Sequence, residues 1–416
     1  MAQESARSLA IAALREWRRG QRFADAILQD SLARSALQPH DRAFATELFY
    51  GVLRNLTLLD FWIRLLRDGS IDHDSRDLLR LGLYQLLLLR TPTHAGVYET
   101  VELAGRRNRS FINAILRSAV RRAAELQHAA QGAQLAVRAS HPEFLVDRWI
   151  ANFGESAASA LCEWNNQPSP VYARVNPLKI SPAEFVERTP HAELLPGQPA
   201  FVRLSQIPSD ALARGECYIQ DPSTSAAVQL LDPQPGNAVL DACAAPGGKS
   251  GFIASLMRNE GELLSCDRDA ARVETLAGNL TRLGVTIARV AQKDWTRPGA
   301  ADGPVPQSFD RILVDTPCTN TGVLRRRVDA RWRLRPDDFT RMPDEQVKII
   351  RAVVPLLKPG GTLVYSTCSI EPEENEQVVS RARAEFPFLH VAGHASVLPF
   401  RDGFDGAFAA KLVRDG

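Results

Sequence analysis

Long hydrophobic runs are absent from this sequence of 416 residues. One of the most apolar stretches, the four leucines at 86–89, is far shorter than the ~18 residues that a membrane span needs. The first residues, MAQESARSLA, carry no basic lead into an apolar core, so we expect no secretory signal. Hydrophobic residues make up 45% of the chain, which is enough to build globular cores. The expectation is a cytoplasmic protein without a membrane partner.

The chain also lacks paired cysteines. No two of its six cysteines have the CxxC spacing of a zinc site or a redox motif, so we predict no metal. Disulfides are not expected in a large chain without an export signal. The default interpretation of each cysteine is a small buried side chain. The six are Cys162, Cys217, Cys243, Cys266, Cys318 and Cys368.

Lysine is scarce, with 6 residues against 44 arginines, and the net charge is only +2. Residues 1–130 contain 19 arginines, no lysine and 14 acidic residues. Guanidinium groups bind phosphates through planar, bidentate contacts, so this region is a candidate surface for nucleic acid. A solvated helical surface in a chain that simply prefers arginine explains the composition equally well. Charge alone leaves both interpretations open.

Hydrophobic spacing divides the chain into regions of different class. Apolar residues recur at helical spacing through residues 1–130, for example around 44–56, which predicts an all-helical bundle. The Ala- and Gln-rich stretch 125–140 is weakly patterned and is the expected linker. Prolines break 141–230 into short pieces, which indicates a small mixed subdomain.

From residue 231 to 416, predicted strands alternate with predicted helices. This order is typical of a doubly wound, mostly parallel sheet, so the predicted fold class is an all-α N-terminal bundle followed by an α/β, Rossmann-like domain. The expected strands are 238–243, 262–267, 286–291, 310–317, 361–369 and 406–413, and the expected helices follow the loop at 247 and span 269–283, 344–357 and 373–385.

The sequence DACAAPGGKS (241–250) stands between the first strand and its helix, where open α/β sheets bind ligands. It lacks the GxGxxG of dinucleotide sites, and Cys243 stands where a phosphate-binding loop has its first glycine. Gly247 and Gly248 still allow close approach of the backbone to a ligand. A generic turn is the alternative interpretation.

Two acidic residues follow the next two strands. Asp267 ends the second strand, where a carboxylate can accept hydrogen bonds from ribose hydroxyls. Asp294 follows the third strand and can accept from an adenine amino group. Each alone is more often a helix cap or a turn residue. Together with the glycine loop, they favour an adenosine ligand without a pyrophosphate.

The ends of two later strands carry cysteines. Cys318 follows Asp315-Thr316-Pro317, and Cys368 lies in Ser366-Thr367-Cys368-Ser369. Carbon 5 of cytosine becomes nucleophilic when a thiolate adds to carbon 6, so methylation there needs a cysteine, a group at N3 and a base. Both cysteines should lie on the rim beside the ligand loop, with Asp315 able to reach the N3/N4 edge.

The motifs DACAAPGGKS, DTPCTNTG and YSTCS, in this order, resemble those of the RNA cytosine-5 methyltransferases over 141–416. More narrowly, the chain resembles the bacterial 16S ribosomal RNA enzymes of the RsmB type. Through DRAFATELFYGVLRN and FINAILR, residues 1–130 resemble the NusB-like RNA-binding domain fused to those enzymes.

The resemblance implies ribosomal RNA as the partner, with no obligate protein partner evident, and S-adenosylmethionine as the cofactor. It also implies that Cys368 is the nucleophile and that Cys318 assists product release, with Asp315 as the third catalytic residue. The family usually has Asp-Ala-Pro-Cys-Ser-Gly-Thr-Gly, whereas this chain has Thr316, Thr319 and Asn320 in place of Ala, Ser and Gly. The residues implied to bind the cofactor are Cys243, Ala244, Ala245, Pro246, Gly247, Gly248, Lys249, Asp267, Asp294 and Asp315.

An arginine-rich segment, 324–335, follows the Cys318 motif with six arginines and Trp332. Its arginines can bind RNA phosphates, and Trp332 can stack on a base; an exposed helix is the alternative. Arg174 and Asn176 lie in a segment that, by resemblance, packs near the site.

Three other functions are weighed against this interpretation. An amino-group methyltransferase needs Asp/Asn-Pro-Pro-aromatic, and the chain has Asp-Thr-Pro-Cys. A nicotinamide oxidoreductase is disfavoured by the missing GxGxxG. A non-catalytic RNA-binding or transcription factor is disfavoured by the intact set of Cys368, Cys318, Asp315 and the Gly-Gly-Lys loop.

Overall fold

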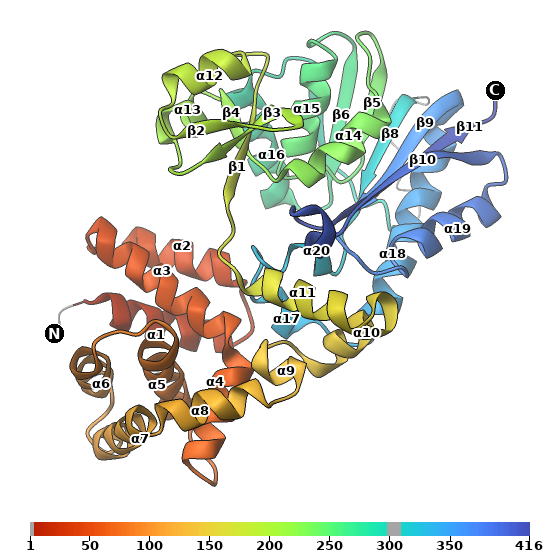
Figure 1. Ribbon diagram of the computed structural model, residues 1–416. Helices are drawn as coiled ribbons and strands as arrows, with labels where there is room; N and C mark the ends of the chain where they lie inside the picture. Colours follow the sequence, from red (N-terminus) through yellow and green to blue (C-terminus); the bar gives the residue numbers. More distant parts are fainter. Residues whose placement is uncertain (1–3, 298–308) are drawn as a thin grey trace. The chain divides into compact units, whose positions relative to one another are not determined.

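The computed structural model describes residues 4–297 and 309–416, and within them the chain divides into two compact units (Figure 1). We call them the helical unit and the sheet unit, and each has its own hydrophobic core. The helical unit contains the chain up to Gln167 together with Leu324–Arg333, and the sheet unit contains Pro168–Val323 and Leu334–Gly416.

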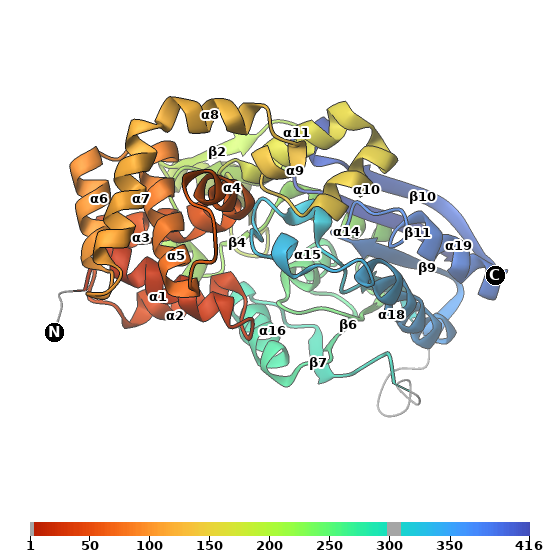
Figure 2. The same ribbon diagram turned by 90° about the horizontal axis from the view of Figure 1, so that it is seen from below.

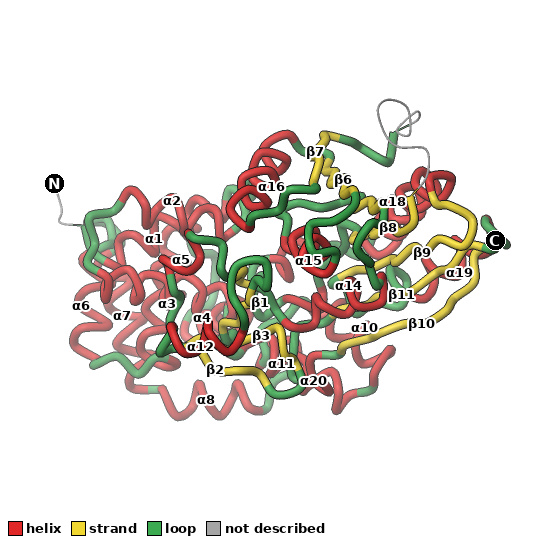
Figure 3. Tube along the Cα trace, turned by 90° about the horizontal axis from the view of Figure 1, so that it is seen from above, coloured by secondary structure: helices red, strands yellow, loops and turns green. Residues whose placement is uncertain are grey.

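All regular elements assigned in the described part of the helical unit are helices (Figure 3). Residues 1–3 of the predicted domain 1–130 lie outside the described residues. The hydroxyl of Ser5 caps the first helix by accepting a hydrogen bond from the N–H of Ser8 at 3.2 Å. The bounds are α1 (Ala6–Arg18), α2 (Ala24–Arg34), α3 (Pro39–Arg54), α4 (Leu56–Leu66), α5 (His73–Leu83), η1 (Tyr84–Leu88), α6 (Thr93–Glu102), α7 (Arg109–Arg121), α8 (Ala123–Gln131), α9 (Leu135–Arg138), α10 (Glu143–Phe153), α11 (Glu155–Asn166) and α17 (Ala330–Arg333).

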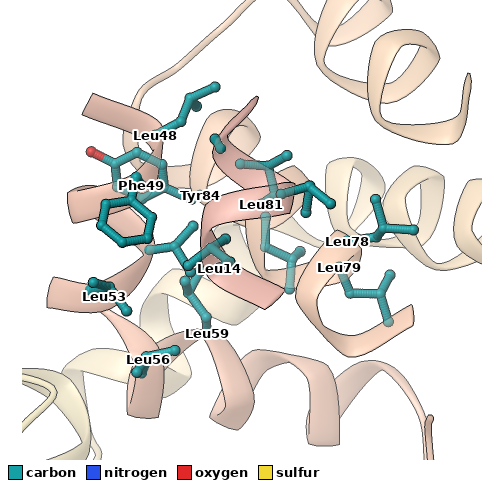
Figure 4. Close-up of a cluster of buried hydrophobic side chains, with 14 of the residues drawn as sticks. Leu14, Leu48, Phe49, Leu53, Leu56, Leu59, Leu78, Leu79, Leu81 and Tyr84 are labelled. Atoms are coloured by element: carbon teal, nitrogen blue, oxygen red, sulfur yellow. The ribbon is translucent and has the colours of Figure 1, made fainter. Parts of the chain in front are cut away.

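The core of the helical unit is built from the apolar faces that the spacing predicts. Leu48, Phe49 and Leu53 of α3 are fully buried and lie with Leu59 of α4 in one cluster (Figure 4). A polar group buried in such a core needs a hydrogen-bond partner. The indole N–H of Trp62 in α4 donates to a backbone carbonyl of α8 at 2.8 Å. The predicted all-helical N-terminal region is confirmed. No helix within the described residues combines the length and the apolar composition needed to cross a bilayer.

Two expectations about this unit are corrected. The stretch 125–140, expected to be a linker, is mostly helical: α8 places Leu126 and Ala130 in the core, and α9 buries Ala136. Trp332, expected to stack on an RNA base, packs against the helical core, and its indole N–H donates to the carbonyl of Leu53 at 2.8 Å. Arg331 is fully buried, and its guanidinium donates to the carbonyl of Asn165 at 3.0 Å. These two side chains therefore hold the segment within the helical unit.

The sheet unit begins with a small antiparallel sheet in the order β2-β3-β1-β4. One face carries two short helices over a core that includes Val175, Phe185 and Val202. The bounds are β1 (Val171–Val175), α12 (Pro182–Arg188), β2 (Ala192–Leu195), β3 (Gln198–Leu204), α13 (Ser209–Ala213), β4 (Cys217–Ile219) and η2 (Pro222–Thr224).

A seven-stranded sheet follows, in the order β10-β11-β9-β8-β5-β6-β7. Its strands from β9 to β7 pair in parallel, and β11 pairs antiparallel with β9 and β10. The predicted doubly wound, mostly parallel sheet is therefore confirmed. The strands are β5 (Ala238–Asp241), β6 (Glu262–Asp267), β7 (Ala288–Gln292), β8 (Phe309–Asp315), β9 (Leu357–Thr367), β10 (Leu389–Val397) and β11 (Ala407–Arg414).

Helices cover both faces of this sheet. Leu313 faces a cluster that includes residues of α14 and α15, whereas its neighbours Ile312 and Val314 face a cluster that includes residues of α18 and α19. Helices α18 and α19 lie side by side (Figure 2). The remaining elements are α14 (Ser225–Leu231), α15 (Gly248–Leu256), α16 (Ala270–Leu283), η3 (Thr321–Val323), α18 (Asp338–Val353), η4 (Val354–Leu356), α19 (Glu376–Glu385) and α20 (Pro399–Asp402).

Sequence spacing located most of these elements but missed two features. Strand β10 was not predicted, because its exposed edge residues carry little hydrophobic pattern. Helix α18 begins six residues before the predicted start at 344, and Pro343 lies inside it. As the sixth residue of the helix, Pro343 removes one i→i−4 hydrogen bond, which is why a helix start after it was expected.

Replacing Leu313 with Ala should destabilise the sheet unit by about 2–5 kcal/mol, because the lost side chain leaves a cavity at a fully buried position. Leu256→Ala is the matched control, since this leucine is 39% exposed at the end of α15. Thermal unfolding followed by circular dichroism should show a lower midpoint for L313A and little change for L256A. Equal midpoints for the two variants would contradict the packing.

Candidate active site

Three neighbouring parallel strands bring the predicted motifs to one edge of the sheet. β8 pairs with β5 on one side and with β9 on the other, so their carboxyl ends lie together (Figure 1). Asp315 at the end of β8 is in register with Ser366 near the end of β9. The loops after all three strands therefore start side by side at one edge of the sheet.

The glycine loop between β5 and α15 packs closely against side chains of the small sheet. Gly247 adopts a φ of +105°, which favours glycine because it has no Cβ. A Cβ on Gly248 would come within 2.8 Å of the ring of Tyr218 in the small sheet. The buried Arg174 donates from its guanidinium to the carbonyl of Gly248 at 3.0 Å. The placement of Arg174 beside the site, expected from the resemblance, is thus confirmed.

A buried carboxylate lies beneath this loop. Asp241 ends β5, and its Oδ2 accepts a hydrogen bond from the hydroxyl of Ser250 at 2.6 Å. Its Oδ1 is buried and has no hydrogen-bond partner among the described residues. Burial raises the pKa of Asp241 to about 7. An acceptor of this kind can bind a cationic donor from a ligand.

The carboxylate of Asp315 accepts hydrogen bonds on both of its oxygens. Lys249 of the glycine loop donates from Nζ to its Oδ2 at 2.6 Å, and Ser366 donates from Oγ to its Oδ1 at 2.7 Å. Burial favours a lower pKa for Lys249, but the Asp315 carboxylate outweighs burial and raises the pKa above its usual value. The site therefore contains a charged Lys–Asp pair whose carboxylate is aimed by a serine.

The structure brings Cys318 and Cys368 together at neighbouring strand ends, with their sulfurs 3.2 Å apart. Cys318 is 9% exposed, whereas Cys368 is more accessible. The hydrogen bond with Cys368, followed by burial, raises the pKa of Cys318 well above its usual value. Cys318 is therefore a protonated thiol at neutral pH, beside the more accessible sulfur.

Gly322 lets the Cys318 loop approach the end of β9. Its N–H donates to the carbonyl of Cys368 at 3.0 Å, and its own carbonyl accepts from the N–H of Gly406 at 2.7 Å. A Cβ on Gly322 would lie 2.7 Å from the carbonyl oxygen of Cys368 and 2.7 Å from the Cα of Gly406. Only glycine fits between these two backbones without a shift.

Glu374, which sequence analysis did not single out, connects the two cysteine loops. Its carboxylate accepts from the N–H of Thr319 at 3.0 Å, from the hydroxyl of Ser369 at 2.7 Å and from the amide of Gln346 at 2.8 Å. Burial raises the pKa of Glu374, and the hydrogen bonds partly offset this. The acidic run from Glu371 to Glu376, directly after the YSTCS motif, is the sequence signal that could have pointed to it.

The two aspartates after β6 and β7 have protein partners. Asp267 is 3% exposed, and its Oδ2 lies 3.4 Å from the guanidinium of Arg272. Asp294 accepts at Oδ1 from both the N–H and the hydroxyl of Thr296. The Thr296 hydroxyl lowers the pKa of Asp294, with Arg297 adding to this effect. Asp294 thus caps a turn, which was the alternative interpretation from sequence. Its role toward an adenine stays a prediction.

The other residues of the predicted cofactor loop differ in burial. Ala244 and Ala245 are buried, Pro246 is exposed, and burial raises the pKa of Cys243 well above its usual value. Cys243 is therefore a neutral side chain of the loop. Cys162, Cys217 and Cys266 are buried, as their default interpretation held. In the described part of the chain, no group of three or more His, Cys, Asp or Glu residues could hold a metal ion.

Family models and relatives cover nearly all of this chain. The model for 16S rRNA methyltransferase RsmB/F matches residues 228–413, the NusB family model matches 4–121, and the RsmF/B-like ferredoxin-like domain matches 141–194. The probable ribosomal RNA small subunit methyltransferase B of Bacillus subtilis is 32% identical, with 100% of each chain covered. The ribosomal RNA small subunit methyltransferase B of Enterobacter sp. is 36% identical, over 90% of this chain and 91% of that one.

The chain belongs to the RsmB/F family of 16S ribosomal RNA methyltransferases. The fold agrees with solved structures. PH0851 has a TM-score of 0.79 at 22% identity over 99% of both chains, which shows the shared fold. A methyltransferase homolog from Pyrococcus horikoshii has a TM-score of 0.59 at 30% identity over 67% of this chain and 97% of that one. As an RsmB/F member, the chain is a small-subunit ribosomal RNA methyltransferase that uses S-adenosylmethionine.

The residues of the loop fit this methyl donor. S-Adenosylmethionine carries an ammonium group on its methionine part and no pyrophosphate. The unpaired, buried Oδ1 of Asp241 offers an acceptor for such a cation, and the loop lacks the phosphate-binding spacing. The structure of this RsmB/F member therefore agrees with the cofactor at the level of charge.

Gly322→Ala should lower methyltransferase activity at least ~10-fold, because moving one of the two crowded backbones displaces the Cys318 loop from Cys368. Binding of S-adenosylmethionine should change little. Gly278→Ala in α16 is the control, because no atom lies within 4 Å of its added Cβ. A methylation assay and calorimetric titration separate the two effects. Full activity of G322A would contradict the close approach.

Proposed function

We propose that this enzyme methylates carbon 5 of a specific cytosine in 16S ribosomal RNA through a covalent adduct between Cys368 and cytosine carbon 6. One observation carries the proposal. Two sulfurs lie 3.2 Å apart at the ends of adjacent parallel strands, beside an ion pair between Lys249 of the proposed cofactor loop and Asp315 at the end of β8. Addition of one thiol to a pyrimidine ring, with the second thiol assisting release, uses two sulfurs in this arrangement.

Cys368 is the proposed nucleophile because its sulfur is the more accessible of the two. Its thiolate adds to carbon 6, which makes carbon 5 an enamine carbon able to attack a methyl group. S-Adenosylmethionine supplies the electrophilic methyl carbon when it is bound. A base then accepts the proton of carbon 5, the carbon 5–carbon 6 double bond re-forms, and the sulfur of Cys368 leaves.

Asp315 and Lys249 are proposed to hold the pyrimidine edge. The Ser366 and Lys249 contacts orient the Asp315 carboxylate, which is suited to hydrogen-bond the N3/N4 edge of cytosine. Negative charge develops on the ring as the thiolate adds, and the ammonium of Lys249 is close enough to stabilise it. Oriented charges of this kind cost no reorganisation during the reaction.

Cys318 is proposed to assist release of the methylated product. Its thiol is a hydrogen-bond neighbour of the Cys368 sulfur and is held beside it by the Gly322 and Glu374 contacts. From this position it acts on the same ring face from which Cys368 must leave. The cofactor is proposed to lie against the loop 243–249, with Asp267 at the ribose and Asp294 at the adenine.

The two alternative functions with RNA substrates find less support. An amino-group methyltransferase has no use for adjacent thiols. A non-catalytic RNA-binding protein does not require Lys249, Asp315, Cys318 and Cys368 to converge. Docking of RNA on the arginine-rich helical unit remains part of the proposal, and it does not depend on Trp332.

Cys368→Ala should abolish methylation, a loss of at least ~10³-fold, because it removes the sulfur that adds to carbon 6. Binding of S-adenosylmethionine should persist. Incorporation of a labelled methyl group into 16S RNA, followed by bisulfite mapping of the product, measures both the reaction and the ring position. Cys266→Ala, at a buried cysteine inside β6, is the control for loss of a thiol. An active C368A enzyme would refute the nucleophile.

Cys318→Ala should instead trap a covalent protein–RNA adduct, because addition and methyl transfer proceed while release fails. The adduct is measured as a slower band on a denaturing gel that disappears after RNase treatment. The double variant C318A/C368A should form none, which assigns the bond to Cys368. Normal turnover of C318A without an adduct would reject the release role.

A further inference from the structure

Asn320 stands in the loop between the two cysteines, at a position where the family usually has glycine. Its φ of +61° lies in the left-handed region, which explains the preference for glycine there. Asparagine is among the few other residues that adopt this conformation readily. The chain therefore keeps the backbone of the loop and adds a side-chain amide beside the proposed nucleophile.

The amide group of Asn320 contacts both cysteines. Its Nδ2 donates to the backbone carbonyl of Cys318 at 2.7 Å, and its Oδ1 accepts from the thiol of Cys368 at 3.3 Å. The carbonyl of Cys318 can only accept, so it fixes which end of the amide faces the sulfur. Because the Cys318 thiol lies 3.2 Å from the Cys368 sulfur, the contacts form a closed ring.

We propose that Asn320 is a positioning residue that holds the thiol of Cys368 in one rotamer and favours its protonated form until substrate arrives. The proposal deepens, and rests on, the assignment of Cys368 as nucleophile. Loss of the proton would leave a thiolate facing the partial negative charge of Oδ1. The amide cannot turn Nδ2 toward the sulfur without placing Oδ1 against the carbonyl of Cys318.

The other groups near Cys368 do not explain this preference. Lys249 interacts electrostatically with Cys368 and favours the thiolate, and the thiol of Cys318, 3.2 Å away, can donate a hydrogen bond to a thiolate at Cys368. These groups stay in place when only Asn320 is changed. A resting thiol avoids wasteful reaction of the nucleophile with oxidants and electrophiles, since the thiolate is the reactive form.

The test is the pH profile of alkylation of Cys368 by iodoacetamide in the full-length enzyme without RNA or cofactor. Mass spectrometry of the peptide containing Cys368 measures the rate at each pH. Asn320→Gly removes the acceptor and suits the left-handed backbone, so its profile should shift to lower pH by about 0.5 unit or more. Asn320→Asp keeps the shape and adds a negative charge, so its profile should shift to higher pH.

Asn259→Gly is the matched control, because Asn259 also has a left-handed φ, of +58°, and lies in the turn after α15. Its alkylation profile should coincide with that of the unchanged enzyme. The proposal is overturned if N320G and N320D both coincide with the unchanged enzyme, if N320G shifts to higher pH, or if N259G shifts as far as N320G. Because the assay contains no RNA, its outcome is separate from that of the C368A methylation test.

Discussion

The buried carboxylate of Glu374 determines how the two cysteine loops meet. It accepts hydrogen bonds from Thr319 on one loop and from Ser369 on the other, and a further hydrogen bond from the amide of Gln346 in α18. A buried carboxylate is costly unless it is fully hydrogen-bonded, so the loops cannot separate without leaving it unsatisfied. The distance between the two sulfurs, and with it the proposed chemistry, depends on this one group.

The chain path also connects the Cys318 loop directly to the helical unit. Immediately after η3, the chain leaves the sheet unit, contributes Leu324–Arg333 to the helical unit and then returns. Arg331 is buried there against backbone carbonyls, without a carboxylate partner. Burial lowers the pKa of Arg331 to about 9. An arginine-rich run that reads as an RNA contact therefore serves in part to build the protein.

Much of the fold and the main residues of the site were predictable from sequence. Periodic apolar spacing predicted β6 and β11 to within a residue. Because parallel strands end at the same edge of a sheet, the sequence also predicted that Asp315, Cys318 and Cys368 lie at one edge. The rest depended on contacts between segments distant in sequence. Strand β10 has no clear apolar pattern, and the partners of Glu374 lie between 5 and 55 residues away.

The sequence by itself determined the family, the cofactor class and the strand ends that carry the reactive side chains, because local spacing and motif chemistry encode them. Only the tertiary structure decided which groups share a hydrogen bond. It paired Lys249 with Asp315, brought Asn320 to the sulfur of Cys368 and placed Trp332 against helices. These outcomes depend on ångström-scale packing of side chains from separate elements, which no linear pattern records.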